Sequence, residues 1–308
     1  MYDRLIVSVI IPAHNAGASL ADAVSSALTQ SGTEIEVVIV DDKSSDNTLA
    51  LARTLAAGDD RVRVVENEEN TGPGESRNRA IAAARGEWLA LLDADDRWLA
   101  GRLERLVRHL ADADVASDDV LIREPGGRSR TLLATGGFGR PTPARLAAAD
   151  LARHGLGLLK PVIRRSFLEE HGLRFDPTLR IGEDFCLFVD LLLAGARWVQ
   201  TGDATYEYRP GAGSVTAGRR EHLRGRLEAD SRLLERPGVQ ADPELLALLE
   251  RRVAWLADLD RLLAARERGG RGFARALVAD PRLARTAVRH AYHVARRRAR
   301  GRAGRSNR

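Results

Sequence analysis

Four short apolar runs alternate with amphipathic stretches along the first hundred residues. The runs are rich in β-branched residues and leucine, which is typical of strands buried on both faces of a sheet; they cover residues 5–11, 35–40, 62–65 and 88–92. The stretches between them carry apolar residues at helical spacing, over residues 17–30, 45–56 and 74–84. This alternation predicts βαβ units and an α/β fold with a mostly parallel sheet flanked by helices.

The pattern becomes less regular after residue 100 and changes again near residue 216. Two further apolar runs, at residues 115–122 and 158–163, read as strands, and residues 185–193 read as a buried helix face. Long stretches rich in Arg, Glu and Leu follow, and they predict helices at roughly residues 219–235, 243–267 and 272–299. We therefore expect an α/β domain over residues 1–216 and a helical C-terminal extension over residues 217–308.

Composition narrows the class of protein. With 308 residues, 44% of them hydrophobic, the chain can bury a sizeable core, which excludes a disordered or collagen-like protein. Cys186 is the only cysteine, so an intrachain disulfide and a Cys-rich zinc site are excluded and a reducing compartment is favoured. No apolar run approaches the roughly 18 residues of a membrane-spanning helix. We expect a cytoplasmic protein that is soluble or peripheral on the inner face of the membrane.

The positive charge is concentrated at the C-terminal end. Residues 281–308 hold ten arginines and no acidic residue. Because the whole chain carries +5, the first 280 residues carry about −5. A solvated end and contact with an anionic membrane surface both fit such a tail, whereas no motif for specific nucleic-acid binding accompanies it. The long amphipathic helices beyond residue 217 also allow a homodimer.

Polar residues follow three of the predicted strands. The segments are Pro12-Ala-His-Asn15, Asp41-Asp42 and Asp93-Ala-Asp95-Asp96. Ligands of open α/β sheets bind beyond the carboxyl ends of the strands, so these segments are expected to converge on one binding site. Clustered carboxylates repel one another unless a cation compensates. Asp93, Asp95 and Asp96 are therefore candidates to hold Mg²⁺ or Mn²⁺, which prefer oxygen ligands.

Two common nucleotide-binding motifs are missing from the sequence. No Gly-x-x-x-x-Gly-Lys-Ser/Thr loop occurs, which excludes a P-loop NTPase, and no Gly-x-Gly-x-x-Gly follows the first strand, which argues against a dinucleotide site. Five blocks instead resemble glycosyltransferase family 2 in order and spacing: VSVIIPAHN (7–15), EVVIVDDKSSDNT (36–48), NTGPGESRN with GEWLALLDADD (70–78 and 86–96), RIGEDF (180–185) and YEYRPGAGSVT (206–216). The resemblance covers about residues 5–216, or some 70% of the chain.

This resemblance implies a GT-A fold, a divalent metal and a nucleotide-sugar donor, most often a UDP-sugar. Matched position by position, one group of residues corresponds to the nucleotide-sugar site, and it consists of Pro12, Ala13, Asn15, Asp41, Asp42, Arg77, Asp93 and Ala94. Either Asp41 or Asp42 would accept a hydrogen bond from the base, with Asp42 favoured, and Arg77 would lie near the base or the phosphates. Asp95, together with Asp93, would bind the metal.

The resemblance also implies that Asp184 is the general base, with Glu183 beside it. Inverting transfer needs a carboxylate that takes the proton of the attacking acceptor hydroxyl, and a cation that offsets the charge of the departing nucleoside diphosphate. Taken alone, the same two residues also suit an ordinary helix N-terminus, where acidic side chains are favourable.

The sequence departs from the family pattern in two places. His14 stands where an aromatic residue is common, and the Gln-x-x-Arg-Trp element of processive synthases is absent. We therefore expect one sugar to be added per encounter. The resemblance implies transfer to a glycan or a lipid-linked saccharide, in the assembly of an extracellular or cell-envelope polysaccharide, a lipopolysaccharide or a glycoprotein glycan. Two alternatives stay open, a nucleotidyltransferase that makes nucleotide-sugars and a catalytically idle binding scaffold. This sequence lacks the Gly-rich loop that is usual in the first class. It also keeps the carboxylates that a protein of the second class would have lost.

Overall fold

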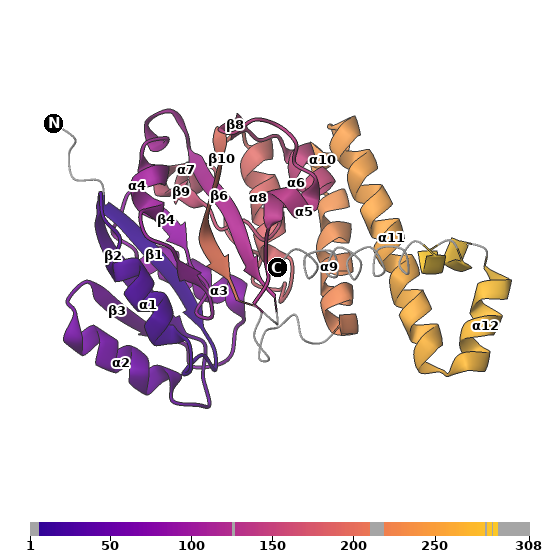
Figure 1. Ribbon diagram of the computed structural model, residues 1–308, viewed down its shortest axis with the longest axis horizontal. Coiled ribbons are helices and arrows are strands. Elements are labelled where there is room, and N and C mark those ends of the chain that lie inside the picture. The colour runs from indigo at the N-terminus through magenta and orange to yellow at the C-terminus, as the bar shows by residue number, and fades with distance from the viewer. Residues whose placement is uncertain (1–5, 125–126, 210–218, 281, 285, 289–308) are drawn as a thin grey trace, which may run out of the picture.

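The computed structural model describes residues 6–124, 127–209, 219–280, 282–284 and 286–288 (Figure 1). In its first part, parallel strands alternate with helices along the chain. The strands are β1 (Ile6–Ala13), β2 (Glu34–Asp41), β3 (Val62–Glu66) and β4 (Trp88–Leu91), and the helices are α1 (Leu20–Leu28), α2 (Thr48–Gly58) and α3 (Pro73–Ala83). The predicted βαβ pattern is confirmed.

The second part adds strands to the same sheet. They are β5 (Arg97–Trp98), β6 (Val115–Arg123), β9 (Val162–Arg164) and β10 (Trp198–Tyr208), with β7 (Ser129–Thr131) and β8 (Ala144–Arg145) paired at the margin. The strand order is β3-β2-β1-β4-β9-β6-β10-β5. β9 runs antiparallel to both β4 and β6, whereas β6 and β10 are parallel. The sheet is therefore mixed, and its long strands are mostly parallel, as predicted.

Short helices connect the strands of the second part. They are α4 (Arg102–Val107), a 3₁₀ turn (Leu110–Asp112), α5 (Leu132–Gly136), α6 (Ala148–His154), α7 (Arg165–Glu170) and α8 (Glu183–Leu193). The strand expected over residues 158–163 is shorter and begins at Val162. Pro161 precedes it and has no N–H to donate to a neighbouring strand, so regular pairing starts one residue later.

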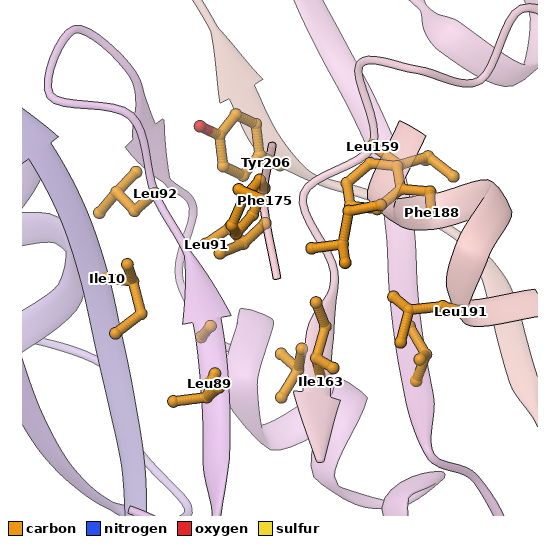
Figure 2. Packing of buried hydrophobic residues seen from close by; sticks show 14 of the residues in the cluster. Ile10, Leu89, Leu91, Leu92, Leu159, Ile163, Phe175, Phe188, Leu191 and Tyr206 are labelled. Atoms are coloured by element: carbon orange, nitrogen blue, oxygen red, sulfur yellow. The ribbon is translucent and has the colours of Figure 1, made fainter. Parts of the chain in front are cut away.

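The apolar core holds the centre of the sheet and its covering helices together (Figure 2). Ile10 of β1, Leu89 and Leu91 of β4, and Ile163 of β9 come from three neighbouring strands, and all four are almost inaccessible to solvent. Phe188 and Leu191 of α8 join this layer from the other end of the sheet. Because protein interiors are closely packed, this core fixes the ends of β1, β4 and α8 relative to one another.

Helices α9 (Arg219–Leu234), α10 (Pro237–Gln240), α11 (Pro243–Glu267) and α12 (Gly270–Ala279) form the C-terminal region. In Figure 1, α9 and α11 lie side by side next to α8. The main core continues into them through Ala229, Leu233, Leu245 and Leu249. A second cluster between α9 and α11 contains Leu223, Leu256, Leu259 and Leu262. The expected helices are thus present, and the division into two domains at residue 217 stays a prediction.

Two further expectations concern the C-terminal end and the membrane. The expected helix over residues 272–299 corresponds to α12 as far as Ala279, and most of the Arg-rich tail lies outside the described residues. Residues 210–216 of the fifth sequence block also lie outside them. Among the helices that the structure describes, none is long and apolar enough to cross a membrane.

Candidate active site

The three polar strand ends meet at one edge of the sheet. The backbone N–H of Asp42, just past β2, donates to the carbonyl of Ala13 at the end of β1 (2.8 Å), and Leu92, just past β4, donates to Ile10 (3.1 Å). These bonds place the segments after β1, β2 and β4 next to one another. The convergence predicted from the parallel strand pattern is confirmed.

Asp42 is buried and held by the loop that precedes α3. Its Oδ1 accepts hydrogen bonds from the side chain of Asn67 (2.7 Å) and the backbone of Thr71 (2.8 Å), and its Oδ2 accepts one from the backbone of Gly72 (2.8 Å). Burial alone would raise the pKa of Asp42, but these donors lower it below the ordinary value. Asp42 is therefore a fixed carboxylate, and its Oδ2 has one donor and room for a second.

Asp41 is also buried, at the last position of β2. Its Oδ2 accepts a hydrogen bond from the backbone of Ser44 (3.1 Å), while its Oδ1 is buried and has no hydrogen-bond partner in the described part of the chain. Buried polar atoms are nearly always satisfied in native proteins. The structure thus leaves an acceptor position on both candidate base-binding residues, Asp41 and Asp42.

The segment after β1 is pinned to the segment after β2. Asn15 has a positive φ of 50°, and its backbone N–H donates to Ser44 Oγ (3.0 Å) while its Oδ1 accepts from the backbone of Ser45 (2.8 Å). His14 Nδ1 lies 2.8 Å from the carbonyl oxygen of Asp42. Of the neighbouring candidates, Pro12 is half-buried, and Ala13 and Ala94 are buried.

Arg77 of α3 lies among carboxylates and not beside the base-binding residues. One guanidinium nitrogen is 2.7 Å from Glu183 Oε1 and 3.1 Å from Asp184 Oδ1, and the other is 2.8 Å from Asp93 Oδ1. The side chain is 4% exposed and stacks at 5.3 Å over the ring of Phe175. Arg77 therefore joins the segment after β4 to the first turn of α8, a role that its place in the sequence motif does not reveal.

Lys160 is the site residue that sequence reasoning missed. Its Nζ lies 2.8 Å from Asp93 Oδ2 and 2.5 Å from Asp184 Oδ2, and its side chain is 4% exposed. One signal pointed to it: Lys160 is one of only two lysines in an arginine-rich chain, and it interrupts an apolar run. Its own carbonyl accepts a hydrogen bond from Arg102 (2.5 Å), which forms a fully buried ion pair with Asp118 (2.8 Å).

Two cations and three carboxylates make up this charged centre. Burial disfavours the charged form of Lys160, but the charges of Asp184 and Asp93 outweigh it and raise the pKa above the ordinary value. Arg77 is shifted in the same direction by Asp184, Asp93 and Glu183, again against burial. The pKa of Asp93 is lowered by Lys160 and Arg77 despite burial, whereas burial and the charge of Asp184 raise the pKa of Glu183.

Asp95 and Asp96 have different surroundings although they are adjacent. Asp95 is half-buried, and burial and the charge of Asp93 raise its pKa. Asp96 is fully buried and accepts hydrogen bonds from the hydroxyl of Tyr206 (2.7 Å) and the backbone of Arg209 (2.8 Å). Burial and the charges of Asp93 and Asp95 raise the pKa of Asp96 to about 8. Both oxygens of Asp96 thus accept hydrogen bonds from β10 and the residue after it, and the expectation that Asp96 helps to hold a metal stays a prediction.

Asp95 fits a metal ion that is bound partly by the protein and partly by a substrate. Both oxygens of Asp93 are paired with cations, and no group of three His, Cys, Asp or Glu side chains in the described residues is arranged to hold a metal. In that part of the structure the carboxylate of Asp95 makes no ion pair or hydrogen bond with another side chain, while its backbone carbonyl accepts from Arg209 Nε (3.1 Å). Mg²⁺ is commonly held by one or two carboxylates together with substrate phosphates and water, and Asp95 suits that arrangement.

Sequence comparisons identify the relatives of this chain. Residues 8–169 match the sequence model described as Glycosyl transferase family 2. The chain is 37% identical to the succinoglycan biosynthesis protein ExoO of Rhizobium meliloti over 75% of its own length and 68% of that protein. It is also 26% identical to WfaP of Escherichia coli, a UDP-Glc:α-D-GlcNAc-diphosphoundecaprenol β-1,3-glucosyltransferase, over 79% of this chain and 91% of that protein.

Solved structures show the same fold at lower identity. S. aureus TarS in complex with UDP-GlcNAc aligns with a TM-score of 0.64 and 20% identity over 82% of this chain and 72% of TarS. The mannosyltransferase PcManGT from Pyrobaculum calidifontis, in complex with GDP-Man and Mn²⁺, aligns with a TM-score of 0.61 and 22% identity over 92% of this chain and 81% of PcManGT. The mixed α/β sheet therefore has the GT-A arrangement. The chain belongs to glycosyl transferase family 2 and is a glycosyltransferase.

Proposed function

We propose that the protein transfers one sugar at a time from a UDP-sugar to a hydroxyl of a glycan or lipid-linked saccharide, with inversion and with a divalent metal. The observation that carries this proposal is the position of Asp184. This carboxylate lies in the first turn of α8, and Lys160 links it to Asp93 at the end of β4. A candidate base thus stands beside the segment that is expected to hold the donor.

The donor would lie across the ends of β1, β2 and β4. Pro12, Ala13 and Asn15 would contact the nucleoside, and Asp42, or Asp41 in its place, would accept a hydrogen bond from the base. Support comes from the acceptor positions left on these two carboxylates. Asp93 and Ala94 would contact the ribose or the phosphates. Arg77 acts in this proposal by holding Asp93, Glu183 and Asp184 in place.

Asp95, next to Asp93, would hold Mg²⁺ or Mn²⁺. When bound, the ion supplies a positive charge for the diphosphate leaving group. The chain itself contributes a partly water-excluded site in which Arg77 and Lys160 already neutralise Asp93. Asp95 is then the carboxylate left to bind the ion. The Mn²⁺ in the complex of PcManGT is consistent with this assignment.

Asp184 would take the proton of the acceptor hydroxyl. As the acceptor oxygen bonds to the anomeric carbon, the bond from that carbon to the phosphate oxygen breaks, and its electron pair leaves with UDP. The proton moves to Asp184, with Oδ1 as the receiving atom, since Oδ2 accepts a hydrogen bond from Lys160 whereas Oδ1 accepts none and meets Arg77 only as an ion pair at 3.1 Å. Attack opposite the leaving group inverts the anomeric centre. Glu183 keeps Arg77 in position beside this oxygen.

The names of the relatives support a place in polysaccharide assembly, which we propose takes place on the cytoplasmic side of the membrane. ExoO is named for succinoglycan biosynthesis, and WfaP for transfer to a saccharide carried on diphosphoundecaprenol. An acceptor of that kind presents both a sugar hydroxyl and a diphosphate.

Binding and hydrolysis of donors test this proposal directly. UDP-, GDP- and dTDP-sugars are each mixed with the protein in Mn²⁺ and in EDTA, and binding is followed by calorimetry and hydrolysis by release of the nucleotide. We expect a response to UDP-sugars that EDTA abolishes. Metal-independent binding would contradict the role of Asp95, and a folded protein that binds no nucleotide would instead support the idle scaffold.

A further inference from the structure

Helix α9 carries one arginine whose surroundings differ from those of its neighbours. Arg220 and Arg224 both form ion pairs with Asp260 of α11 (2.7 and 3.1 Å), and Arg232 pairs with Asp176 (2.9 Å). Arg226 lies between them in sequence and is half-buried, yet it forms no ion pair or hydrogen bond with the residues that the structure describes. Among the arginines of α9 whose side chains the structure describes, Arg226 is thus the one without an ion pair.

Asp230 is the carboxylate whose charge acts on Arg226, but it already pairs with Arg252. Asp230, one turn further along α9, accepts from Arg252 through both of its oxygens (3.0 and 3.1 Å). Burial, followed by the positive charge of Arg252, lowers the pKa of Arg226, and Asp230 offsets this only in part. The segments that the structure does not describe contain a single acidic side chain, Asp3. A half-buried guanidinium without a counter-ion is unfavourable unless a ligand supplies one.

A second unsatisfied group lies one turn before Arg226. His222 is half-buried, and its Nδ1 is fully buried with no hydrogen-bond partner among the described residues. Burial and the charge of Arg226 lower the pKa of His222, so the two side chains are electrostatically coupled. Residues four apart lie on the same face of a helix. His222 and Arg226 therefore present two nitrogen groups on one face of α9.

This part of α9 packs directly against the start of α8. A side-chain carbon on Gly225 would lie 2.7 Å from Cβ of Ile181, and one on Gly182 would lie 2.6 Å from Cβ of Ala229. The backbone of α9 is thus in close contact with residues 181 and 182 at two positions, Gly225 and Ala229. These positions lie before and after Arg226 in the sequence. Gly182 stands two residues before Asp184. Arg226 follows Gly225 in the chain and therefore lies in the part of α9 that contacts the segment leading to the candidate base.

We propose that Arg226 and His222 form a binding site for the diphosphate of a lipid-linked acceptor. An arginine fork and an imidazole are groups that bind phosphate oxygens well, and the contact of α9 with Ile181 and Gly182 places them beside the segment that leads to Asp184. The proposal rests on the proposed function, since it assigns the acceptor to the same active site. It places acceptor recognition in the C-terminal helices and leaves the donor to the strand ends.

Calorimetry with geranyl diphosphate, a short soluble prenyl diphosphate, tests the site. The titration is made with UDP and Mg²⁺ at saturation, so that the nucleotide site is filled, and geraniol serves as the uncharged probe. We expect Arg226→Gln to weaken geranyl diphosphate binding by about tenfold or more, the loss that removing a charged hydrogen bond produces. The control Arg224→Gln, on the same helix but exposed and paired with Asp260, should leave it unchanged, and neither variant should alter the affinity for UDP.

Several results would overturn the proposal. They are absence of binding to the wild-type protein, equal affinity in Arg226→Gln, an equal loss of UDP affinity in that variant, and displacement of the probe by inorganic phosphate at equal concentration. If Arg226→Gln does not fold, His222→Gln provides the second variant, and it should also weaken binding. If the proposed function is wrong, the result will be different: the wild-type protein itself will not bind UDP in a metal-dependent way.

Discussion

Lys160 Nζ lies 2.5 Å from Oδ2 of Asp184 and 2.8 Å from Oδ2 of Asp93, so one buried ammonium joins the segment after β4 to the first turn of α8. The two carboxylates are 91 residues apart in the sequence. Arg77 makes the same connection through their other oxygens. In the proposed mechanism, binding of donor phosphates near Asp93 and removal of a proton at Asp184 are therefore linked through shared cations.

Replacing Lys160 should affect both stability and catalysis. Lys160→Met leaves Asp93 and Asp184 without one buried partner, which typically costs about 3–5 kcal/mol of unfolding free energy. Lys160→Arg keeps the charge and should retain most of that stability, while changing the position of Asp184. Urea unfolding measures the first effect, and kcat and KM of transfer measure the second. A Lys160→Met protein with wild-type stability would show that these contacts contribute little.

Asp184 and Asp95 should fail in different ways. Asp184→Asn removes the base but keeps the shape of the side chain, so transfer should fall by about 10²–10⁴-fold while Mn²⁺-dependent UDP binding stays unchanged. Asp95→Asn should weaken that binding directly. Glu183→Gln is the matched control, because it stands beside Asp184 and also contacts Arg77. Near-normal turnover in Asp184→Asn would refute its assignment as the base.

The sequence was sufficient to predict that Asp42 and Asp93 lie at the same edge of the sheet. Both follow buried strands in a βαβ pattern, and parallel strands bring their carboxyl ends to one edge. Pattern alone could not bring Asp184 to that edge, because a helix start far along the chain can pack in many places. Its position was expected only from resemblance to the family.

Side-chain direction was the part that the sequence could not supply. Arg77 matches a motif near the expected nucleotide site, yet the packing of α3 turns it toward three carboxylates. Asp96 matches the expected acidic cluster, yet its partner Tyr206 comes from β10, 110 residues later. Lys160 was hidden because its partners are distant in sequence and an apolar run surrounds it. Each of these contacts depends on tertiary packing.

The buried ion pair of Arg102 and Asp118 should stabilise the segment that carries Lys160. Arg102 is inaccessible to solvent, pairs with Asp118 and donates to the carbonyl of Lys160. Arg102→Met strands the buried Asp118 carboxylate and should cost about 3–5 kcal/mol. The double variant Arg102→Met with Asp118→Leu removes both charges and should recover part of that loss. Urea denaturation of the wild type, Arg102→Met, Asp118→Leu and the double variant measures the coupling, and strictly additive losses would contradict it.

Cys186 should be unreactive in the folded protein. It lies in α8 two residues after Asp184 and is 3% exposed. Burial, then the negative charges of Asp190 and Asp230, raises the pKa of the thiol to about 12 from an ordinary 9.0. The neutral thiol is thus favoured by folding, so its contribution to stability is complete below pH 9 and is lost as the pH rises towards 12.

Labelling with a thiolate-specific reagent such as 5,5′-dithiobis(2-nitrobenzoic acid) measures this protection at pH 8. Because the thiolate is the reactive species, we expect no labelling of the native protein over the minutes in which an unfolded sample in urea reacts completely. The rate in intermediate urea should then follow the opening of α8 and α9, since Cys186 Sγ contacts the carbonyl of Ala229. Rapid labelling of the native protein would mean that α8, and Asp184 with it, is not held as firmly as the contacts of Lys160 and Arg77 require.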